Sequence, residues 1–426
     1  MLQVSWIREN REKLEIGYQK RNLKADVLLL VDEAIQIDDQ RKSLQTILDA
    51  ALAGINEKSR VIGEMMKSGQ AAAALPLKEE VTNIKSSISQ WEADLKEHNL
   101  NLENILLSLP NVPHESVPFG KEAEDNEVFR PWPNALPDLG PDALPHWELS
   151  NKYGIFDLPL GVKLTGAGFP VFRGKGARLE RALINYFLDR ATAAGFEEIN
   201  PPLLVNKESA RGTGQIPDKD AQMYYVERDD FYLIPTAEVP ITNIYRDVIV
   251  DEKQFPIKMC GYTPCFRREA GSYGAHVKGL NRVHQFNKVE IVQIEHPDKS
   301  YDTLMQMLEH VATLLDELGL PFRILRLCGG DIGNASALTF DFEVWSAAQQ
   351  RWLEVSSVSN FETYQANRMK CRFRDSNGKM QLVHTLNGSA LALARIVACI
   401  IENNQTPEGI SMPDILVPYT GFAILD

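Results

Sequence analysis

Residues 27–67 read VLLLVDEAIQIDDQRKSLQTILDAALAGINEKSRVIGEMMK, and apolar side chains recur in this stretch every seven residues. Two interleaved series carry the repeat: Leu30, Ile37, Leu44, Ala51 and Met65, and then Ala34, Leu48, Ile55 and Ile62. Lys58 interrupts the first series and Arg41 the second. A heptad of this kind is typical of a long helix with one narrow apolar seam, as in a coiled coil.

A second heptad follows a short segment that Gly69 and Pro76 bracket. Its apolar positions are Leu77, Ile84, Trp91 and Ile105, interleaved with Val81, Ile88, Leu95, Leu102 and Leu109. Because each seam must be buried against a partner, we predict an antiparallel helical hairpin, an N-terminal coiled-coil arm within residues 1–110. A helix of about forty residues extends roughly 60 Å. By themselves, the heptads favour a dimerisation coiled coil or a spacer.

Charge and cysteine usage limit the class of protein. The 426 residues include 45 Lys and Arg against 58 Asp and Glu, a formal net charge of −13, so any nucleic-acid partner must meet a local basic patch. The five cysteines form no CxxC pair, and we expect neither a disulfide framework nor zinc. No stretch approaches ~18 uninterrupted apolar residues, and the first residues lack a signal-peptide core. We expect a cytoplasmic protein with no membrane partner.

The remainder of the chain has a different pattern. Eight prolines between 110 and 145 predict an irregular connector over residues 111–145. From residue 146 to 426, an amphipathic helix fits 176–194, and several short runs have strand character. These runs are 231–235, 286–294, 321–327, 339–345 and 352–358. Because strands outnumber the helices between them, we predict an α+β domain with an antiparallel β-sheet flanked by helices.

The segment 261–291, GYTPCFRREAGSYGAHVKGLNRVHQFNKVEI, offers phosphate chemistry. The chain has no GxxxxGK[ST] loop and no strand–GxGxxG–helix unit. An enzyme that handles phosphates without those loops neutralises them with side chains, usually with the bidentate fork of arginine. Arg267, Arg268 and Glu269 lie together ahead of a long loop, and Phe286 and Glu290 lie on the predicted returning strand. An FRRE group alone is more often a solvated charge run.

Several ordered motifs together resemble the seryl-tRNA synthetase family. They are PTAEVPITN (235–243), FRREAGS (266–272), the GLNRVHQFNKVE run (279–290), EVSSVSN (354–360) and HTLNGSALALAR (384–395). Further similar stretches are LPNVPHESVP (109–118), HWEL (146–149), GARLERALINYFLD (176–189) and GTGQIP (212–217). The resemblance runs from end to end and includes the heptad arm. It implies a class II aminoacyl-tRNA synthetase, an ATP-dependent serine–tRNA ligase that forms AMP and pyrophosphate.

The resemblance implies a set of ATP contacts. Arg267 would face the α-phosphate, where charge develops as the serine carboxylate attacks, and Arg395 would pair with the γ-phosphate. Glu269 would accept from the adenine amino group, while Phe286 stacks on the ring and the Val283 backbone contacts it. Arg268, Val355 and Ser356 complete the implied contacts, and Glu354 with Ser357 would hold Mg²⁺ carried by the nucleotide. By residue type alone, Phe286 is more often a core aromatic, and Arg395 equally often belongs to a structural ion pair.

For serine, the matching residues are Thr236, Ala237, Glu238, Glu290 and Ser389. A carboxylate is the acceptor that the small serine hydroxyl needs, and Glu290 is our first choice for it. Alanine would leave that carboxylate unpaired, which such sites disfavour by roughly 10⁴-fold or more. The residues leave open which glutamate takes the ammonium and which the hydroxyl. Threonine would be excluded by lack of room for its methyl group.

The family also implies a homodimer, with Pro202 of the 195–206 motif at the interface, and an arm that binds tRNA(Ser). The charges of the arm favour its tip, where Lys58, Arg60, Lys67, Lys78 and Lys85 lie. The sequence departs from the family pattern at Ala390 and Ala394, where glycine is common, and at His276 and Val277 in the loop that approaches the tRNA acceptor end. The resemblance leaves open whether tRNA(Sec) is a second substrate.

Three alternative functions differ in class or specificity. A class II enzyme for threonine would be expected to carry zinc ligands, which the sequence lacks, and proline is a further possible specificity. A ligase that loads amino acids onto a carrier protein generally lacks the arm. A catalytically inactive synthetase paralogue, acting as a coiled-coil interaction protein, need not retain Arg267, Glu269, Glu290, Glu354 and Arg395.

Overall fold

The computed structural model describes residues 1–218, 221–269 and 278–426. It divides into two compact units. The large unit comprises Met1, Ile16–Asn22 and Asn111–Asp426, and the arm unit comprises Leu2–Glu15 and Leu23–Pro110. No helix among the described residues is long and apolar enough to cross a membrane.

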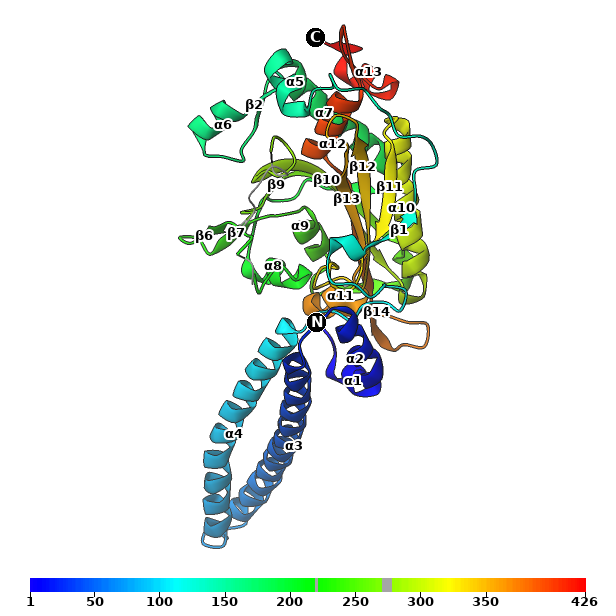
Figure 1. The fold of residues 1–426 in the computed structure, drawn as a ribbon. Helices are drawn as coiled ribbons and strands as arrows, with labels where there is room; N and C mark the ends of the chain where they lie inside the picture. Colours follow the sequence, from blue (N-terminus) through cyan, green and yellow to red (C-terminus); the bar gives the residue numbers. More distant parts are fainter. Residues whose placement is uncertain (219–220, 270–277) are drawn as a thin grey trace. The chain divides into compact units, whose positions relative to one another are not determined.

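The arm unit is an antiparallel helical hairpin (Figure 1). Its long helices are α3 (Asp26–Lys67) and α4 (Leu75–Ser108), and α1 (Val4–Glu9) contacts α3. The buried apolar residues of the pair are Val31, Ala34 and Leu48 from α3, and Val81, Ile88, Leu102, Leu106 and Leu107 from α4. The predicted seam is therefore confirmed, although Leu30 of the first series is exposed.

The two charged residues that interrupt the heptad of residues 27–67, Arg41 and Lys58, both form ion pairs. Arg41 donates to the buried Asp38 at 2.9 Å, and Asp38 is also 2.7 Å from Lys42. These cations lower the pKa of Asp38, although its burial acts in the opposite direction. Lys58 pairs with Glu80 across the hairpin. Charged residues within the repeat thus pair at the seam and leave the helices intact.

The large unit is built on an eight-stranded sheet in the order β1-β11-β12-β13-β16-β10-β9-β4. Neighbouring strands are antiparallel except for β4 and β9, which are parallel. Its strands are β1 (Glu127–Arg130), β4 (Glu197–Glu198), β9 (Ile257–Phe266), β10 (Gln285–Glu295), β11 (Phe322–Arg326), β12 (Leu338–Ser346), β13 (Arg351–Asn360) and β16 (His384–Ala392). The predicted α+β class with a largely antiparallel sheet is confirmed.

Three long helices cover the sheet and share one hydrophobic core with it: α7 (Gly174–Ala193), α10 (Ser300–Glu317) and α12 (Leu393–Asn403). Strand β10 shows how the sheet separates core from site. Val289 and Ile291 are fully buried in that core, whereas Lys288 and Glu290 line a cleft. Successive side chains of a strand point to opposite faces, so this alternation follows directly from the sequence KVEI.

The remaining elements are short helices and short strands (Figure 1). The helices are α2 (Arg11–Lys20), α5 (His146–Tyr153), α6 (Leu158–Leu164), α8 (Lys207–Thr213), α9 (Glu238–Asn243), α11 (Thr363–Met369) and α13 (Val417–Thr420). The short strands are β2 (Phe156–Asp157), β3 (Val171–Phe172), β5 (Leu204–Val205), β6 (Tyr225–Val226), β7 (Phe231–Leu233), β8 (Ile249–Asp251), β14 (Arg372–Arg374), β15 (Met380–Leu382), β17 (Gln405–Thr406), β18 (Gly409–Ser411) and β19 (Ile424–Leu425).

Candidate functional site

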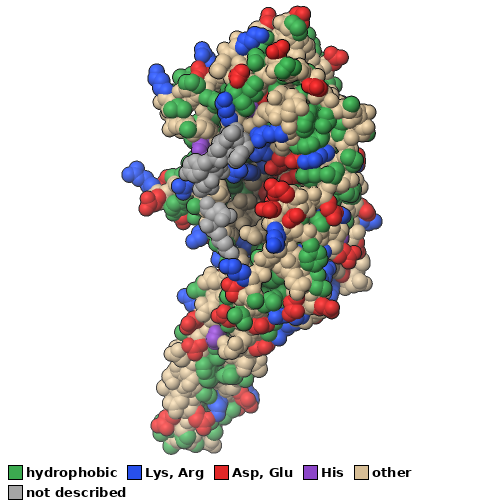
Figure 2. Space-filling view, in the orientation of Figure 1, with side chains coloured by type: hydrophobic (Ala, Val, Ile, Leu, Met, Phe, Trp, Pro, Cys, Tyr) green, Lys and Arg blue, Asp and Glu red, His purple; other side chains and the backbone are tan. Residues whose placement is uncertain are grey.

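A cleft of about 660 Å³ opens on the large unit, and its lining brings together segments far apart in the sequence. Figure 2 shows acidic and basic side chains gathered in this hollow. The predicted site residues in its lining are Thr236, Glu238, Arg267, Glu269, Val283, Phe286, Glu290, Glu354, Val355, Ser356, Ser357, Ser389 and Arg395. Ala237 is fully buried beside the cleft, and Arg268 is exposed, with its backbone N–H donating to Gln222.

A buried polar group occupies one part of the cleft. Thr236 Oγ1 donates to Glu290 Oε2 at 2.9 Å, and Lys288 Nζ donates to the same Thr236 hydroxyl at 3.0 Å. Lys288 also forms an ion pair with Glu290, and both side chains are almost completely buried. Ser389 lies directly opposite Glu290 in the β10–β16 register. A buried carboxylate with a cation and a hydroxyl around it can orient a small polar ligand.

Glu238 supplies a second buried carboxylate in the same part of the cleft. It is the first residue of α9, and Gln365 of α11 donates to its Oε1 at 2.6 Å. Burial, followed by the nearby negative charge of Glu290, raises the pKa of Glu238 to about 7. Hydrogen bonds from Gln365 and Asn387 act in the opposite direction. Glu238 is therefore poised to change its protonation state near neutral pH.

Arg267 and Phe286 lie together across the β9–β10 pair. The Arg267 guanidinium carbon is 5.3 Å from the centre of the Phe286 ring, and Arg267 Nε donates to the Pro235 carbonyl at 3.3 Å. The Arg267 backbone N–H donates to the carbonyl of His284 at 2.9 Å, and the His284 ring bonds back to Arg267 O at 3.0 Å. These contacts hold the guanidinium at the cleft, where it can meet an anion.

Glu269 forms an ion pair with Arg282, which lies on the segment that returns toward β10. Its backbone is in the left-handed region, with φ at 48°, which is uncommon for a residue other than glycine. Val283 is buried in the same returning segment and lines the cleft. The two departures His276 and Val277 lie outside the described residues.

Glu354 and Ser357 are three residues apart on β13, and in a regular strand two side chains at this spacing point to opposite faces. The pairing of β13 with β12 shifts at this point, where Ser356 and Glu354 pair with consecutive residues of β12. Val355 is thus an extra residue, a β-bulge, and Glu354 and Ser357 both line the cleft. The Ser356 hydroxyl donates to Ser389 O at 2.5 Å and ties β13 to β16.

The oxygens of Glu354 and Ser357 fit the donor preference of Mg²⁺, which takes few protein ligands when a nucleotide supplies others. Asp341 lies opposite Ser357 in the register and shares a hydrogen bond with it. Burial, followed by the charge of Glu354, raises the pKa of Asp341 well above its usual range. Among the described ranges, no group of three or more His, Cys, Asp or Glu side chains is arranged to hold a metal ion.

Arg395, in the first turn of α12, bridges two other parts of the cleft. Its Nε donates to the carbonyl of Asn281 at 3.0 Å, and its Nη1 donates to the carbonyl of Glu354 at 2.6 Å. It also pairs with the Glu354 carboxylate at 3.3 Å. The two alanine departures nearby, Ala390 and Ala394, are buried.

Lys288, Gln365 and Asp341 belong to the cleft or support it and were not predicted from the sequence. Lysine is rarely buried without a partner, and the KVE spacing of Lys288 and Glu290 on a predicted strand was a usable signal for Lys288. Gln365 and Asp341 gave no such signal, because their roles depend on tertiary neighbours.

The five predicted tRNA-contacting residues lie on the arm hairpin. Arg60, Lys67, Lys78 and Lys85 are exposed, and Lys58 is half-buried. Arg60 pairs with Glu64 at 3.1 Å, one turn along α3, and Lys58 pairs with Glu80. Exposed ion pairs of this type are weak, so these cations can exchange their partners for other anions.

Comparison with known proteins defines the class of this site. A family model described as "tRNA synthetase class II core domain (G, H, P, S and T)" matches residues 224–404. A second model, "Seryl-tRNA synthetase N-terminal domain", matches residues 1–113. The large unit therefore carries the core of a class II aminoacyl-tRNA synthetase.

Similar proteins extend over the whole chain. The "Serine--tRNA ligase" of Salinibacter ruber is 48% identical over 425 residues, which cover 99% of each chain. That of Prosthecochloris aestuarii is 45% identical and covers 100% of this chain and 99% of the relative. The crystal structure of seryl-tRNA synthetase from Pyrococcus horikoshii complexed with ATP matches with a TM-score of 0.92 at 32% identity, covering 100% of this chain and 99% of that one. The chain belongs to the seryl-tRNA synthetase family, whose members are ATP-dependent serine–tRNA ligases, and the family predicted from the motifs is confirmed.

Proposed function

We propose that the cleft activates L-serine with ATP to form seryl-adenylate and transfers the seryl group to the 3′ end of tRNA(Ser). The observation that carries this proposal is the meeting of two chemistries in one cleft. The buried Thr236–Lys288–Glu290 group can receive a small polar amino acid, and Arg267 and Arg395 offer guanidinium groups to phosphates. Family membership supports the same reaction.

In the activation step, a carboxylate oxygen of serine attacks the α-phosphorus. The bond between the α-phosphorus and the oxygen that bridges it to the β-phosphorus breaks. Pyrophosphate leaves with the electron pair of that bond. We assign Arg267 to the α-phosphate on the strength of the family motif, and His284 and Pro235 fix its backbone and its Nε. A preorganised cation at developing charge stabilises the transition state more than the ground state. The transfer step then forms the ester with a ribose hydroxyl of tRNA and releases AMP.

For the nucleotide we assign Phe286 and the Val283 backbone to the adenine ring, and Glu269 to its amino group. Arg282 pairs with the Glu269 carboxylate, so this ion pair would be exchanged or shared when adenine binds. Arg395 is assigned to the γ-phosphate, and Arg268, Val355 and Ser356 are further proposed contacts. Glu354 and Ser357 are the proposed ligands of Mg²⁺, which would neutralise phosphate charge when it is bound with ATP.

For serine we assign Thr236, Ala237, Glu238, Glu290 and Ser389. Lys288 already supplies a cation to Glu290, which leaves Glu238 as the carboxylate better suited to the serine ammonium. Glu290 and Ser389, which face each other across β10 and β16, suit the serine hydroxyl. A site that hydrogen-bonds a substrate hydroxyl rejects analogues without it, because buried polar groups would be left unpaired.

For the whole molecule we propose a division into a tRNA-binding arm (1–110), a connector (111–145) and a catalytic domain (146–426). Lys58, Arg60, Lys67, Lys78 and Lys85 are the proposed tRNA contacts of the arm. Shape and phosphate recognition suit an RNA helix, whose deep groove hides the bases. We further propose a homodimer in the cytoplasm. The experiment that tests the function is charging of homologous total tRNA with labelled serine and ATP. Stoichiometric seryl-tRNA, AMP and pyrophosphate support the proposal, and no charging with an otherwise folded protein refutes it.

A further inference from the structure

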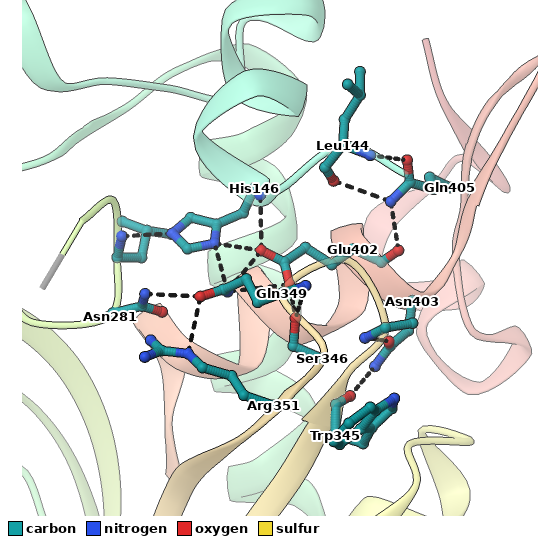
Figure 3. A network of polar contacts seen from close by, with 12 residues as sticks. Leu144, His146, Asn281, Trp345, Ser346, Gln349, Arg351, Glu402, Asn403 and Gln405 are labelled. Carbon is teal, nitrogen blue, oxygen red and sulfur yellow. Dashed lines mark hydrogen bonds and ion pairs between the residues drawn. The ribbon is translucent and has the colours of Figure 1, made fainter. Parts of the chain in front are cut away.

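A buried polar network lies behind the cleft and joins four elements of the large unit (Figure 3). At its centre is Glu402, near the end of α12, with no solvent exposure. Its carboxylate accepts from the His146 backbone N–H at 2.8 Å and from His146 Nδ1 at 2.6 Å. It also accepts from Gln349 Nε2 at 2.9 Å and from the Ser346 hydroxyl. Four donors thus converge on one buried carboxylate.

The His146 ring connects this carboxylate to the backbone of the segment that returns from residue 278 to residue 283, here called the return segment. The backbone N–H of Leu280 donates to His146 Nε2 at 2.8 Å. Nε2 is therefore the acceptor, and the ring proton lies on Nδ1, where it is donated to Glu402. A Cβ at Gly279 would lie 2.0 Å from Nε2, so only glycine permits this close approach.

Two further contacts bind the return segment to the same network. Gln349, which donates to Glu402, accepts from Asn281 Nδ2 at 3.1 Å. Trp147, the neighbour of His146 on α5, places its ring 4.6 Å from the ammonium of Lys278. The HWEL sequence that opens α5 therefore contacts the return segment with both of its first two side chains.

The return segment itself forms part of the cleft, since Leu280, Asn281, Arg282 and Val283 line it. The carbonyl of Asn281 accepts from Arg395 Nε. Arg395 and Glu402 are seven residues apart on α12, about two helical turns, so both project from the same side of the helix. One helix therefore fixes the return segment twice, directly through Arg395 and indirectly through Glu402 and His146.

We propose that His146 and Glu402 are positioning residues for ATP. They fix the backbone of the return segment, which contributes Arg282 and Val283 to the nucleotide side of the cleft. The same backbone holds the Arg395 guanidinium through the Asn281 carbonyl. This inference rests on the proposed function, which places ATP at that wall. Neither residue lines the cleft, so both act through others. Within the described part of the chain, the Thr236–Lys288–Glu290 group, which we assign to serine, forms no hydrogen bond with this network.

Two substitutions of His146 separate its two hydrogen bonds. His146→Asn keeps an amide donor at the position of Nδ1 and removes the acceptor for Leu280. His146→Gln keeps an amide oxygen that can reach the position of Nε2 and weakens the bond to Glu402. We expect His146→Asn to raise the KM for ATP in serine-dependent pyrophosphate exchange by about 10-fold or more, as for a buried N–H left without its acceptor. The KM for serine is expected to stay within about 2-fold, and His146→Gln is expected to recover most of the loss.

Asn403→Ala is the matched control, because Asn403 is the neighbour of Glu402 and binds Ala347 N and Trp345 O without touching the return segment. It is expected to lower the unfolding temperature without changing the KM for ATP. Gln349→Ala, at a half-buried position, keeps the test decisive if His146→Asn does not fold, and it too is expected to raise the KM for ATP.

The outcomes are distinct. A selective rise in the KM for ATP, with rescue by glutamine, supports the inference. An unchanged KM for ATP in folded His146→Asn or Gln349→Ala overturns it, as does an equal rise in Asn403→Ala, since the network would then serve only stability. Failure of the proposed function would be seen separately, as absence of serine-dependent exchange in the unsubstituted protein.

Discussion

Thr236 Oγ1 donates to Glu290 Oε2 at 2.9 Å across the gap between the start of α9 and strand β10. The same hydroxyl accepts from Lys288 at 3.0 Å, so one threonine oxygen joins a buried cation to a buried carboxylate. With Glu238 nearby, the group contains two carboxylates and one ammonium. The second carboxylate can pair with an ammonium that the ligand brings, such as the α-ammonium of an amino acid.

Lys288→Met is expected to destabilise the protein strongly, because it leaves Glu290 buried without its cation. Breaking a buried pair in this way lowers the free energy of unfolding by about 3–5 kcal/mol. The double substitution Lys288→Met with Glu290→Gln removes both charges, and we expect it to recover much of that loss. Denaturant unfolding of the two single variants and the double variant measures the coupling. Simple additivity of the three values would contradict the paired arrangement.

Serine binding is expected to strengthen as the pH rises through about 7, the pKa of Glu238, because only the ionised carboxylate attracts an ammonium. The effect on stability has the opposite sign. Burial raises this pKa from its ordinary value of 4.5, so the contribution of Glu238 to the free energy of unfolding is greatest below pH 4.5 and is lost as the pH rises to about 7. Glu238→Gln is expected to weaken serine binding and flatten the pH profile of the KM for serine. An unchanged slope in that variant would show that another group titrates.

Arg267→Ala is expected to lower serine-dependent pyrophosphate exchange by about 10²–10³-fold, as for loss of a preorganised donor at developing charge. The fold should remain, since Arg267 is only half-buried and its main contacts are one ring and one carbonyl. Arg374→Ala, at an exposed arginine of β14 that binds the Gly378 carbonyl, is the matched control. Near-normal exchange in Arg267→Ala would contradict the assignment of Arg267 to the α-phosphate.

The sequence predicted the fold wherever a periodic pattern determined it. The heptads set the arm, and the alternation of Lys288, Val289, Glu290 and Ile291 assigned one face of β10 to the core and the other to the cleft. Motif resemblance named Glu354 and Ser357, but their common orientation depends on a β-bulge at Val355 that no periodicity reveals.

Long-range contacts could not be predicted from the sequence patterns, and the reason is physical. Glu402 and His146 are 256 positions apart, and nothing local to either residue indicates the other. The interruptions at Arg41 and Lys58 were visible in the heptads, but their explanation required the partners Asp38 and Glu80. Local spacing thus predicts which face a residue occupies, whereas the identity of a buried polar partner is a property of the folded chain.

Deletion of the arm is expected to separate the two half-reactions. Joining residue 26 to residue 110 through a short Gly/Ser linker removes both long helices of the hairpin. We expect serine-dependent pyrophosphate exchange to remain nearly intact while tRNA charging falls by orders of magnitude. Reversal of Lys58, Arg60, Lys67, Lys78 and Lys85 to glutamate should act more mildly and give a shallower salt dependence of tRNA binding. Monomers without exchange activity would instead identify the arm as a dimerisation element, and sedimentation distinguishes the two results.

We propose that this cleft recognises serine and activates it with ATP. Pyrophosphate exchange measured with each of the twenty amino acids in turn tests this recognition, because exchange reports the activation step separately from the transfer to tRNA. We predict exchange with serine alone, since alanine would leave buried polar groups unpaired and threonine brings a methyl group for which we expect no room. Equal exchange with alanine or threonine, or none with serine, would contradict the assignment of Thr236, Glu238, Glu290 and Ser389.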